Sequence, residues 1–307
     1  MPNPSQQPPK DILPPKSWQH YDLYMAVKNA IFSLPSRFES SLSISGILAT
    51  DLFAFNSSLG ATIEEQVVTS LNRLREVWDP NQKYALYDFE RRSQTFPDVV
   101  FKASTPDIRP QIILGIELKG WYVLAKEKEP SFRYKVTPAV CADADLLVVV
   151  PWALSEVVSG TPRVFTPFVT GARYAATYRN WHWEHQRVSQ ADRTIRLSNV
   201  NQNYPVKSDM ISDQATNDSG GNFGRFARTG VMDAYIVELF DERLVGIPLS
   251  AWQRFFSIFT ESGSSDYIEK ALERLANSVL GASKQEPETK TALFKKFQEI
   301  ASLIDRF

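Results

Sequence analysis

The chain contains one cysteine, Cys141, among its 307 residues. A single cysteine cannot form an intramolecular disulfide, and it excludes a zinc site built from a cluster of cysteines. Long apolar runs are also missing, since none approaches the roughly 20 residues that a membrane-spanning helix needs, and no N-terminal signal pattern is present. These absences predict a soluble, cytoplasmic protein that is not held in a membrane.

An excess of charge of either sign is missing as well. The chain has 34 lysines and arginines against 35 aspartates and glutamates, which gives a formal net charge of −1. A protein that binds nucleic acid by charge alone is usually basic, so the balance argues against that class. It still allows an enzyme that grips a nucleic acid in a local basic cleft, and the length allows a large core in one or two domains.

What the sequence does have is a predicted β-hairpin with acidic and basic residues at the open end of its two strands. Residues 99–101 and 112–116 are apolar and read as strands, and 104–110 between them is dense in turn residues. Opposed residues of an antiparallel pair have a constant index sum, which for Asp98 and Glu117 is 215 and places the turn near 107 or 108. We therefore expect Asp98 to face Glu117 or to lie one position away from it.

The residues around Asp98 and Glu117 suggest a metal site. Glu117 and Lys119 share one face of the second strand, and Leu118 points away. Two carboxylates held close together repel each other unless a cation lies between them, and a few hard oxygen ligands favour magnesium. The alternative is a solvated edge strand that carries Glu117 and Lys119, with Asp98 a turn residue after Pro97.

Elements on both sides of the hairpin complete a sheet with helices. Residues 63–78 predict an amphipathic helix with Glu64 at the edge of its buried face, although the helix dipole alone also favours an acid in a first turn. Residues 84–90 predict a strand and 131–142 a helix. The apolar run at 146–151 is typical of a strand buried on both faces, usually a parallel one. The sequence thus predicts an α/β fold with a mixed central sheet flanked by helices.

The remainder of the chain predicts further helices and two polar segments. Residues 1–16 carry six prolines and are expected to form a flexible or extended arm. A helix is expected from Ser17, a good N-cap, to about residue 34, whereas 36–58 has apolar residues at mixed spacing and is undecided. The other expected elements are helices at 171–187, 250–260, 265–280 and 286–306 and a long polar loop at 198–224.

This order of elements, with Asp98 in a Pro-Asp pair and Glu117-Leu118-Lys119 on the next strand, resembles the PD-(D/E)XK nuclease superfamily. That superfamily includes most type II restriction endonucleases. The resemblance covers roughly residues 60–151, about a third of the chain. It implies a restriction-endonuclease-like α/β core to which N-terminal and C-terminal helices are added.

The resemblance also implies a mechanism and a division of roles. Asp98, Glu117 and the backbone carbonyl of Leu118 would bind Mg²⁺, and Lys119 would sit beside the attacking water, to orient it or to accept its proton. Glu64 would hold a second metal or a metal-bound water, since many members carry an acid on the helix before the core sheet. The expected products carry 5′-phosphate and 3′-hydroxyl ends.

Arg133 and Lys135 are candidates for contact with double-stranded DNA. They lie near the start of the helix expected at 131–142, after the strand that carries the proposed site. Contacts from this position would bind backbone phosphates, which position DNA without reading its sequence. The alternative is that both side chains are ordinary solvated charges.

The Gly-rich segment 219–228 is a second candidate for DNA contact. Its glycines would let backbone amides approach a phosphate, although the segment matches no nucleotide-binding fingerprint. If it becomes ordered on DNA, Asn222, Arg225 and Arg228 could reach base edges. A flexible loop without a ligand is the alternative.

We accordingly divide the chain into four parts. These are the arm at 1–16, an N-terminal helical segment at 17–59, a nuclease core at 60–160, and a mostly helical region at 161–307 that packs on the core for DNA recognition, dimerisation or both.

The leading hypothesis is a magnesium-dependent DNA endonuclease, either a type II restriction enzyme or a related phage-defence nuclease. A homodimer would let two active sites cut two strands, and a restriction enzyme would be encoded near a cognate DNA methyltransferase. One alternative is a structure-specific or repair nuclease of the same fold. Others are a non-cleaving nucleic-acid-binding module and an unrelated α/β protein in which the hairpin is only structural.

Overall fold

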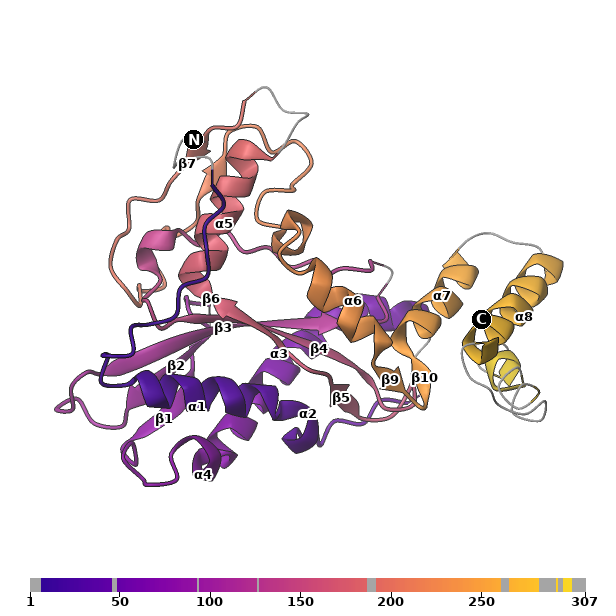
Figure 1. Ribbon diagram of the computed structural model, residues 1–307, viewed down its shortest axis with the longest axis horizontal. Coiled ribbons are helices and arrows are strands. Elements are labelled where there is room, and N and C mark those ends of the chain that lie inside the picture. The colour runs from indigo at the N-terminus through magenta and orange to yellow at the C-terminus, as the bar shows by residue number, and fades with distance from the viewer. Residues whose placement is uncertain are drawn as a thin grey trace.

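The computed structural model describes residues 7–45, 49–92, 94–125, 127–186, 192–260, 265–281, 291 and 295–299, with side chains except at 49–58, 259–260, 265–269 and 279–281. Within these ranges the chain is an α/β protein built on a six-stranded mixed sheet. Figure 1 shows helix α5 above the sheet and α4 below it. The α/β class with a mixed, helix-flanked sheet, as expected from the sequence, is therefore confirmed.

The central sheet has the strand order β1-β2-β3-β4-β5, and β6 also pairs with β4. Its strands are β1 (Tyr87–Arg91), β2 (Val99–Ala103), β3 (Ile112–Tyr122), β4 (Leu146–Leu154), β5 (Pro162–Val164) and β6 (Phe168–Gly171). Among the strands that the structure describes, only the neighbours β3 and β4 run parallel to each other. Two short pairs lie outside this sheet, β7 (Ile195–Arg196) with β8 (Gln214–Ala215) and β9 (Arg243–Leu244) with β10 (Ile247–Pro248).

The predicted hairpin is present in its predicted register. Val99 pairs with Ile116 and Val100 with Gly115, and both pairs have the expected index sum of 215. A bulge after Phe101 shifts the register only near the turn, away from Asp98. The strand β4 is buried along its whole length and runs parallel to β3, so the prediction of a parallel strand buried on both faces is confirmed.

Three predicted helices are confirmed to within a few residues, and the structure also contains a helix that was not predicted from the sequence. The helices are α1 (Tyr21–Phe32), α2 (Leu34–Arg37), α3 (Ala49–Arg73), α4 (Arg75–Trp78), α5 (Ala172–His185), α6 (Asp233–Asp241), α7 (Leu249–Thr260) and α8 (Ser265–Gly281). The confirmed ones are α5, α7 and α8, whereas α6 was not anticipated. Of the helix expected at 286–306 the structure describes only 291 and 295–299, which are helical.

The N-terminal helix begins later than expected. Its N-cap is His20, and Ser17 lies in a turn before it. The backbone N–H of Trp18 bonds the carbonyl of Pro15, and that of Tyr21 bonds the carbonyl of Trp18. The N–H of Tyr21 thus bonds Trp18 instead of the carbonyl of Ser17, which would accept the first bond of a helix capped by Ser17, and the helix starts about one turn further on.

The helix expected at 63–78 is longer at its start and broken near its end. It runs as α3 from Ala49 through Gly60 to Arg73, and α4 follows after a break at Leu74. A Cβ atom on Gly120 of β3 would lie 3.3 Å from the Cα of Gly60. Gly60 therefore marks a close approach of α3 to the sheet rather than the start of a helix.

The prediction of a helix at 131–142 is wrong. Apart from the single 3₁₀ turn η2 (Pro138–Val140), this segment is extended. Arg133 forms a β-bridge with Arg225, and Val136 forms one with Ser212. Long-range backbone pairing therefore takes the hydrogen bonds that a helix would have made, and the alternation of Phe132, Tyr134 and Val136 fits that extended path.

The outer edge of the sheet at β1 is covered by side chains of α3 and α4. The amide of Asn72 donates from Nδ2 to the carbonyl of Phe89 and accepts from its N–H on Oδ1, both at 2.9 Å. Arg75 donates to the carbonyls of Tyr84 and Tyr87. These bonds occupy backbone groups that would otherwise be free to pair with another strand.

Residues 7–15 of the proline-rich arm contain neither helix nor strand. The carboxylate of Asp11 accepts a 2.7 Å hydrogen bond from the hydroxyl of Thr170, and it also accepts from the N–H of Gly171. Gly171 is the N-cap of α5. The arm thus places a negative charge at the amino end of that helix, where the helix dipole favours it.

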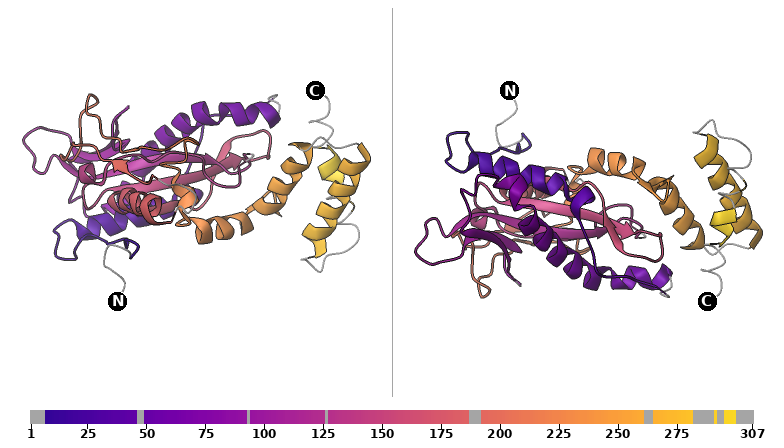
Figure 2. Two further views of the ribbon diagram at one scale, coloured as in Figure 1. Left: turned by 90° about the horizontal axis from the view of Figure 1, so that it is seen from above. Right: turned by 90° about the horizontal axis from the view of Figure 1, so that it is seen from below.

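The C-terminal helices extend away from the sheet. Both views of Figure 2 show α7 and α8 projecting from the body that contains the sheet. The two helices contact each other, and each contains buried apolar residues, among them Trp252 and Phe255 on α7 and Leu272 and Leu275 on α8. Among the helices of the described ranges, none is both long enough and apolar enough to cross a membrane.

Candidate active site

The hairpin brings Asp98, Glu117 and Lys119 together, and we call these three side chains the carboxylate–lysine cluster. Asp98 directly precedes β2, while Glu117 and Lys119 lie two residues apart on β3. The Nζ of Lys119 is 2.7 Å from Oε1 of Glu117 and 3.3 Å from Oδ2 of Asp98. The convergence expected from the sequence is therefore present, with the ammonium of Lys119 between the two carboxylates.

Backbone contacts hold Asp98 in place. Its Oδ2 accepts a 3.0 Å hydrogen bond from the N–H of Leu118, and its carbonyl accepts from the N–H of Arg92. Gly115 leaves room for Pro97 on the face of β3, because a Cβ atom there would lie 2.3 Å from Cγ of Pro97. The glycine therefore lets the residue before Asp98 pack directly on the strand that carries Glu117.

The cluster is largely removed from solvent. The side chains of Asp98, Glu117 and Lys119 are 25%, 9% and 20% exposed. Burial raises the pKa of Glu117 to about 7, against the opposing charge of Lys119. Burial alone would lower the pKa of Lys119, but the charges of Glu117 and Asp98 outweigh it and hold that pKa above its ordinary value.

One oxygen of the cluster lacks a partner. Oε2 of Glu117 is buried, and no described group forms a hydrogen bond to it. A buried acceptor without a partner costs free energy that a bound cation would recover. The two carboxylates and this open oxygen therefore fit a divalent cation of the hard, oxygen-binding kind.

The donor set also limits which cation fits. No group of three or more His, Cys, Asp and Glu side chains suited to a metal occurs in the part of the chain that the structure describes. A site with two carboxylates would have to complete its shell with backbone oxygen, water and substrate. Magnesium accepts such a shell, because it keeps several waters and often binds through one or two carboxylates.

Glu64 lies beside the cluster, on α3. Burial and then the charge of Asp98 raise the pKa of Glu64, while Lys119 and Arg91 lower it. Its Oε2 is 3.7 Å from Nη2 of Arg91, which ends β1. The structure thus places Glu64 within electrostatic reach of the cluster, facing inward as its helical position predicted.

The two segments predicted to contact DNA lie side by side. The N–H of Tyr134 donates to the carbonyl of Gly224 at 2.7 Å, next to the bridge between Arg133 and Arg225. On the other side, the ring of Tyr134 is 6.5 Å from that of Phe96. Residues 131–136 therefore run between the hairpin that carries the cluster and the Gly-rich segment.

Most of the cations predicted to contact DNA are paired with acids in this structure. Arg225 Nη1 is 3.5 Å from Glu127 and Arg228 Nε is 2.6 Å from Glu129, while Arg228 also donates to the side-chain oxygen of Asn222 at 2.8 Å.

Lys135 differs from this pattern in the length of its ion pair. Its Nζ is 3.9 Å from Asp218 and lies 5.8 Å from the ring centre of Phe223. Arg133 and Lys135 are both on the extended segment, so their predicted place at the start of a helix is wrong.

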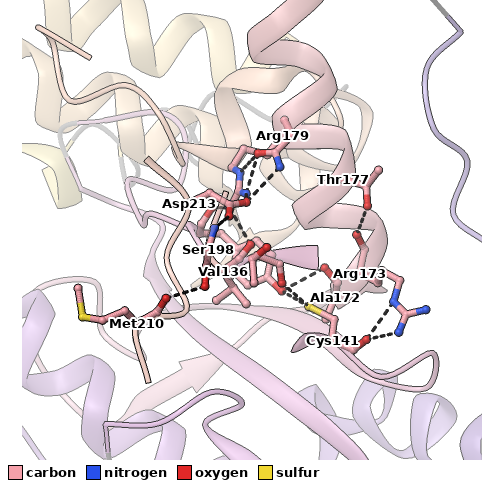
Figure 3. Close-up of polar contacts among 12 residues, drawn as sticks. Val136, Cys141, Ala172, Arg173, Thr177, Arg179, Ser198, Met210 and Asp213 are labelled. Atoms are coloured by element: carbon pink, nitrogen blue, oxygen red, sulfur yellow. Dashed lines mark hydrogen bonds and ion pairs between the residues drawn. The ribbon is translucent and has the colours of Figure 1, made fainter. Parts of the chain in front are cut away.

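A buried ion pair organises this region. The guanidinium of Arg179 on α5 donates to Oδ2 of Asp213 at 2.6 Å and to the carbonyls of Tyr134 and Val136 at 2.7 and 3.0 Å. Figure 3 shows this network, in which Asp213 also accepts from the N–H of Ser198. The pair therefore fixes the extended segment against α5.

Two residues near the cluster have places that the sequence did not assign. Arg91 faces Glu64, and Tyr134 packs toward Phe96 from an extended segment for which the alternating apolar pattern was the available signal. Asp145 directly precedes β4 and accepts from the N–H groups of Ala142 and Gly115 at 2.7 Å. Asp143 forms an ion pair with Arg173.

Comparison of the chain with protein-family models, with curated proteins and with solved structures gave no match.

Proposed function

We propose that this protein is a magnesium-dependent endonuclease that hydrolyses phosphodiester bonds in double-stranded DNA. The observation that carries the proposal is the carboxylate–lysine cluster, in which a buried acid and a partly buried acid share one amine and one oxygen of the buried acid has no partner among the described residues. Hydrolysis of a phosphodiester needs a positioned water, neutralisation of the phosphate charge and a stabilised leaving oxygen. The same cluster also supports the proposed relation to PD-(D/E)XK nucleases with a restriction-endonuclease-like core.

Asp98, Glu117 and the backbone carbonyl of Leu118 would hold the magnesium ion. When bound, the ion supplies positive charge to the scissile phosphate and lowers the pKa of a water molecule. The N–H of Leu118, which bonds Oδ2 of Asp98, fixes the orientation of that carboxylate in advance. Positioning of this kind reduces the rearrangement that the reaction requires.

Lys119 would act on the attacking water. With both carboxylates beside it, the amine is held in its charged form, and a charged amine can orient a water by donating hydrogen bonds to it. If a cation neutralised the carboxylates, the pKa of Lys119 would fall, and the amine could lose its proton to solvent and, once neutral, accept one from the attacking water. Glu64 would position a second metal or a water at the border of the cluster.

Within nucleases, a type II restriction or phage-defence enzyme is the form we propose, acting as a cytoplasmic homodimer with a cognate methyltransferase encoded nearby. Arg133, Lys135, Asn222, Arg225 and Arg228 would contact the DNA, because the fold gathers them on adjacent segments. A repair or structure-specific nuclease with the same site remains the alternative. Sedimentation with and without DNA tests the dimer.

The proposed activity can be tested on supercoiled plasmid DNA with Mg²⁺ or with EDTA. We expect cutting only with Mg²⁺, and Asp98→Asn or Lys119→Met should reduce the rate by about a hundredfold or more. Lys102→Met is the matched control, because Lys102 is an exposed lysine on β2 paired with Glu90. Sequencing of the product ends reports specificity and stagger, and discrete sites would distinguish restriction from repair.

Each other outcome has a clear meaning. DNA that changes mobility but stays intact would contradict the nuclease and support a non-cleaving binding module. DNA that is neither cut nor bound would leave the hairpin a structural element of an unrelated α/β protein.

A further inference from the structure

A second site lies outside the carboxylate–lysine cluster, between α5 and the Gly-rich segment 219–228. It is a cavity of about 290 Å³, and we call it the α5 cavity. The lining residues used below are Arg179, Asn222, Phe223, Arg225 and Arg228. Among the described residues that line it, none is acidic, so the lining carries the charge of three arginines whose acidic partners lie outside the cavity.

The arginines of the cavity differ in how many of their N–H donors have a hydrogen-bond acceptor. Arg179 is fully engaged, with Asp213, Asn180 and two backbone carbonyls as acceptors. Arg225 is not, because its Nε is buried without a hydrogen-bond partner among the described residues and its ion pair with Glu127 is 3.5 Å long. Arg225 thus has donor capacity that the protein itself does not use.

The acids that neutralise Arg225 and Arg228 come from outside the cavity. Glu127 and Glu129 lie on the turn that follows β3, about a hundred positions before the arginines in the sequence. Both pairs are partly exposed to solvent, and exposed pairs are worth only about 0–1 kcal/mol. A ligand that offers more acceptors in better geometry can therefore replace these carboxylates at small cost.

Aromatic residues in the cavity do not indicate a base-stacking site. The ring of Phe223 is 1% exposed, and the guanidinium of Arg179 lies 4.9 Å from its centre. Lys135 also contacts this ring, at 5.8 Å. A nucleobase would need an open ring face, whereas a phosphate needs only the forked donors of arginine.

We propose that the α5 cavity binds a phosphate group through Arg225 and Arg228, and that the phosphate replaces Glu127 and Glu129 as their partner. The side-chain amide of Asn222, which accepts from Arg228, orients that guanidinium. The phosphate comes either from a DNA backbone or from a free ion or nucleotide, and the chemistry of recognition is the same. Binding of a DNA backbone here rests on the DNA contacts proposed above for these arginines, whereas binding of a free ion or nucleotide does not, and neither requires cleavage.

If a phosphate replaces Glu127 and Glu129, removing these two acids should strengthen binding. Purely structural ion pairs would not give this result. Glu127→Gln with Glu129→Gln removes the competing carboxylates, so phosphate and DNA should bind more tightly, by about tenfold at low salt. Arg225→Gln with Arg228→Gln should weaken DNA binding by about tenfold or more and reduce the salt slope by about 2. The matched controls are Glu39→Gln and Arg73→Gln, which break an exposed pair on the N-terminal side of the chain.

Binding is measured in EDTA, by calorimetry with inorganic phosphate and by fluorescence anisotropy with a labelled duplex. Loss of both in the arginine variant identifies the cavity as a phosphate site used by DNA. Loss of phosphate binding alone identifies a free phosphate or nucleotide as the ligand. Arg225→Lys keeps the charge without the fork, and its reduced affinity would show that the geometry matters even if Arg225→Gln failed to fold.

Unchanged affinities and salt slopes in the folded arginine variant would overturn the proposal. So would a glutamate variant that binds no more tightly than Glu39→Gln. The Lys119→Met protein should retain phosphate binding even though it no longer cuts DNA. Failure of the nuclease proposal would therefore appear as binding without cutting, and failure of the cavity proposal as cutting that the arginine variant does not change.

Discussion

At the scale of single residues, Glu117 has one carboxylate oxygen on Lys119 and the other buried without a partner among the described residues. An unpaired buried acceptor costs about 1–3 kcal/mol, and a cation in contact with it would remove that cost. The proposed magnesium site therefore has a consequence for stability that does not require any cutting of DNA.

We predict that Mg²⁺ raises the melting temperature of the DNA-free protein and that Glu117→Gln abolishes the rise. A ligand at a hundred times its Kd stabilises the folded state by about 2.7 kcal/mol, which corresponds to several degrees in a chain of this size. Differential scanning calorimetry checks this. Glu90→Gln on β1 is the control, and an equal rise in both variants would contradict a site at Glu117.

Asp145 makes a prediction about pH. Burial raises its pKa from 3.8 to about 6, although hydrogen bonds from Ala142, Gly115 and Tyr204 lower it. Because the folded pKa is the higher one, the folded state binds more protons than the unfolded state between these values, and stability falls as the pH rises through them. Asp145→Asn cannot ionise and loses this dependence.

The Asp145→Asn protein should therefore be less stable than the wild type at pH 4, and the difference should shrink by about 1–3 kcal/mol towards pH 7. Urea unfolding at a series of pH values measures the difference. Asp143→Asn is the control, since its side chain is 73% exposed. Stability curves that stay parallel from pH 4 to 7 would contradict the raised pKa.

At the scale of elements, local sequence signals were enough to predict the hairpin. They were not enough where long-range contacts determine the conformation of the chain. The turn residues and the apolar strands were enough to give the register that joins Val99 to Ile116, because both are short-range features. The cluster followed from that register and from strand alternation. The helix predicted at 131–142 was wrong, because the backbone partners of this extended segment, Ser212 and Arg225, lie far along the chain.

The start of α3 could not be read from the sequence for a similar reason. Gly60 has the local character of a helix terminus, yet its role depends on Gly120 across the interface. The role of Arg225 and Arg228 was open as well, since their acids at Glu127 and Glu129 become neighbours only in the fold.

The edge of β1 gives a prediction at this scale. Asn72→Leu would leave the N–H and the carbonyl of Phe89 without their partner and would open the edge of the sheet. We expect a loss of about 1–3 kcal/mol in urea unfolding and faster aggregation by light scattering. Thr69→Ala should show neither, because the Thr69 hydroxyl is exposed and bonds only the carbonyl of Glu65 in its own helix.

At the scale of the whole molecule, the ion pair of Arg179 and Asp213 connects parts of the chain that are distant in sequence. It is nearly inaccessible, with side chains 2% and 0% exposed. It joins α5 to the extended segment at Tyr134 and to Ser198. Removing one partner of such a pair leaves a buried charge and is more harmful than replacing both.

Arg179→Met should therefore destabilise the protein by about 3–5 kcal/mol, while the double variant Arg179→Met with Asp213→Leu should recover part of the loss. Chemical unfolding of the wild type, both single variants and the double variant measures the coupling. Arg173→Met, an exposed arginine of the same helix, is the control. Equal losses in the double and the single variants would argue against a coupled pair.

The edge of β4 has a practical consequence for anyone who cuts this protein into pieces. Strands β5 and β6, which occupy that edge, come from beyond residue 160. A recombinant fragment that stopped there would leave one edge of the nine-residue apolar strand β4 bare, with the amides and carbonyls that face away from β3 unpaired. Such a fragment should precipitate or form fibres, so soluble expression of the hairpin and its cluster requires the chain to continue at least through Gly171.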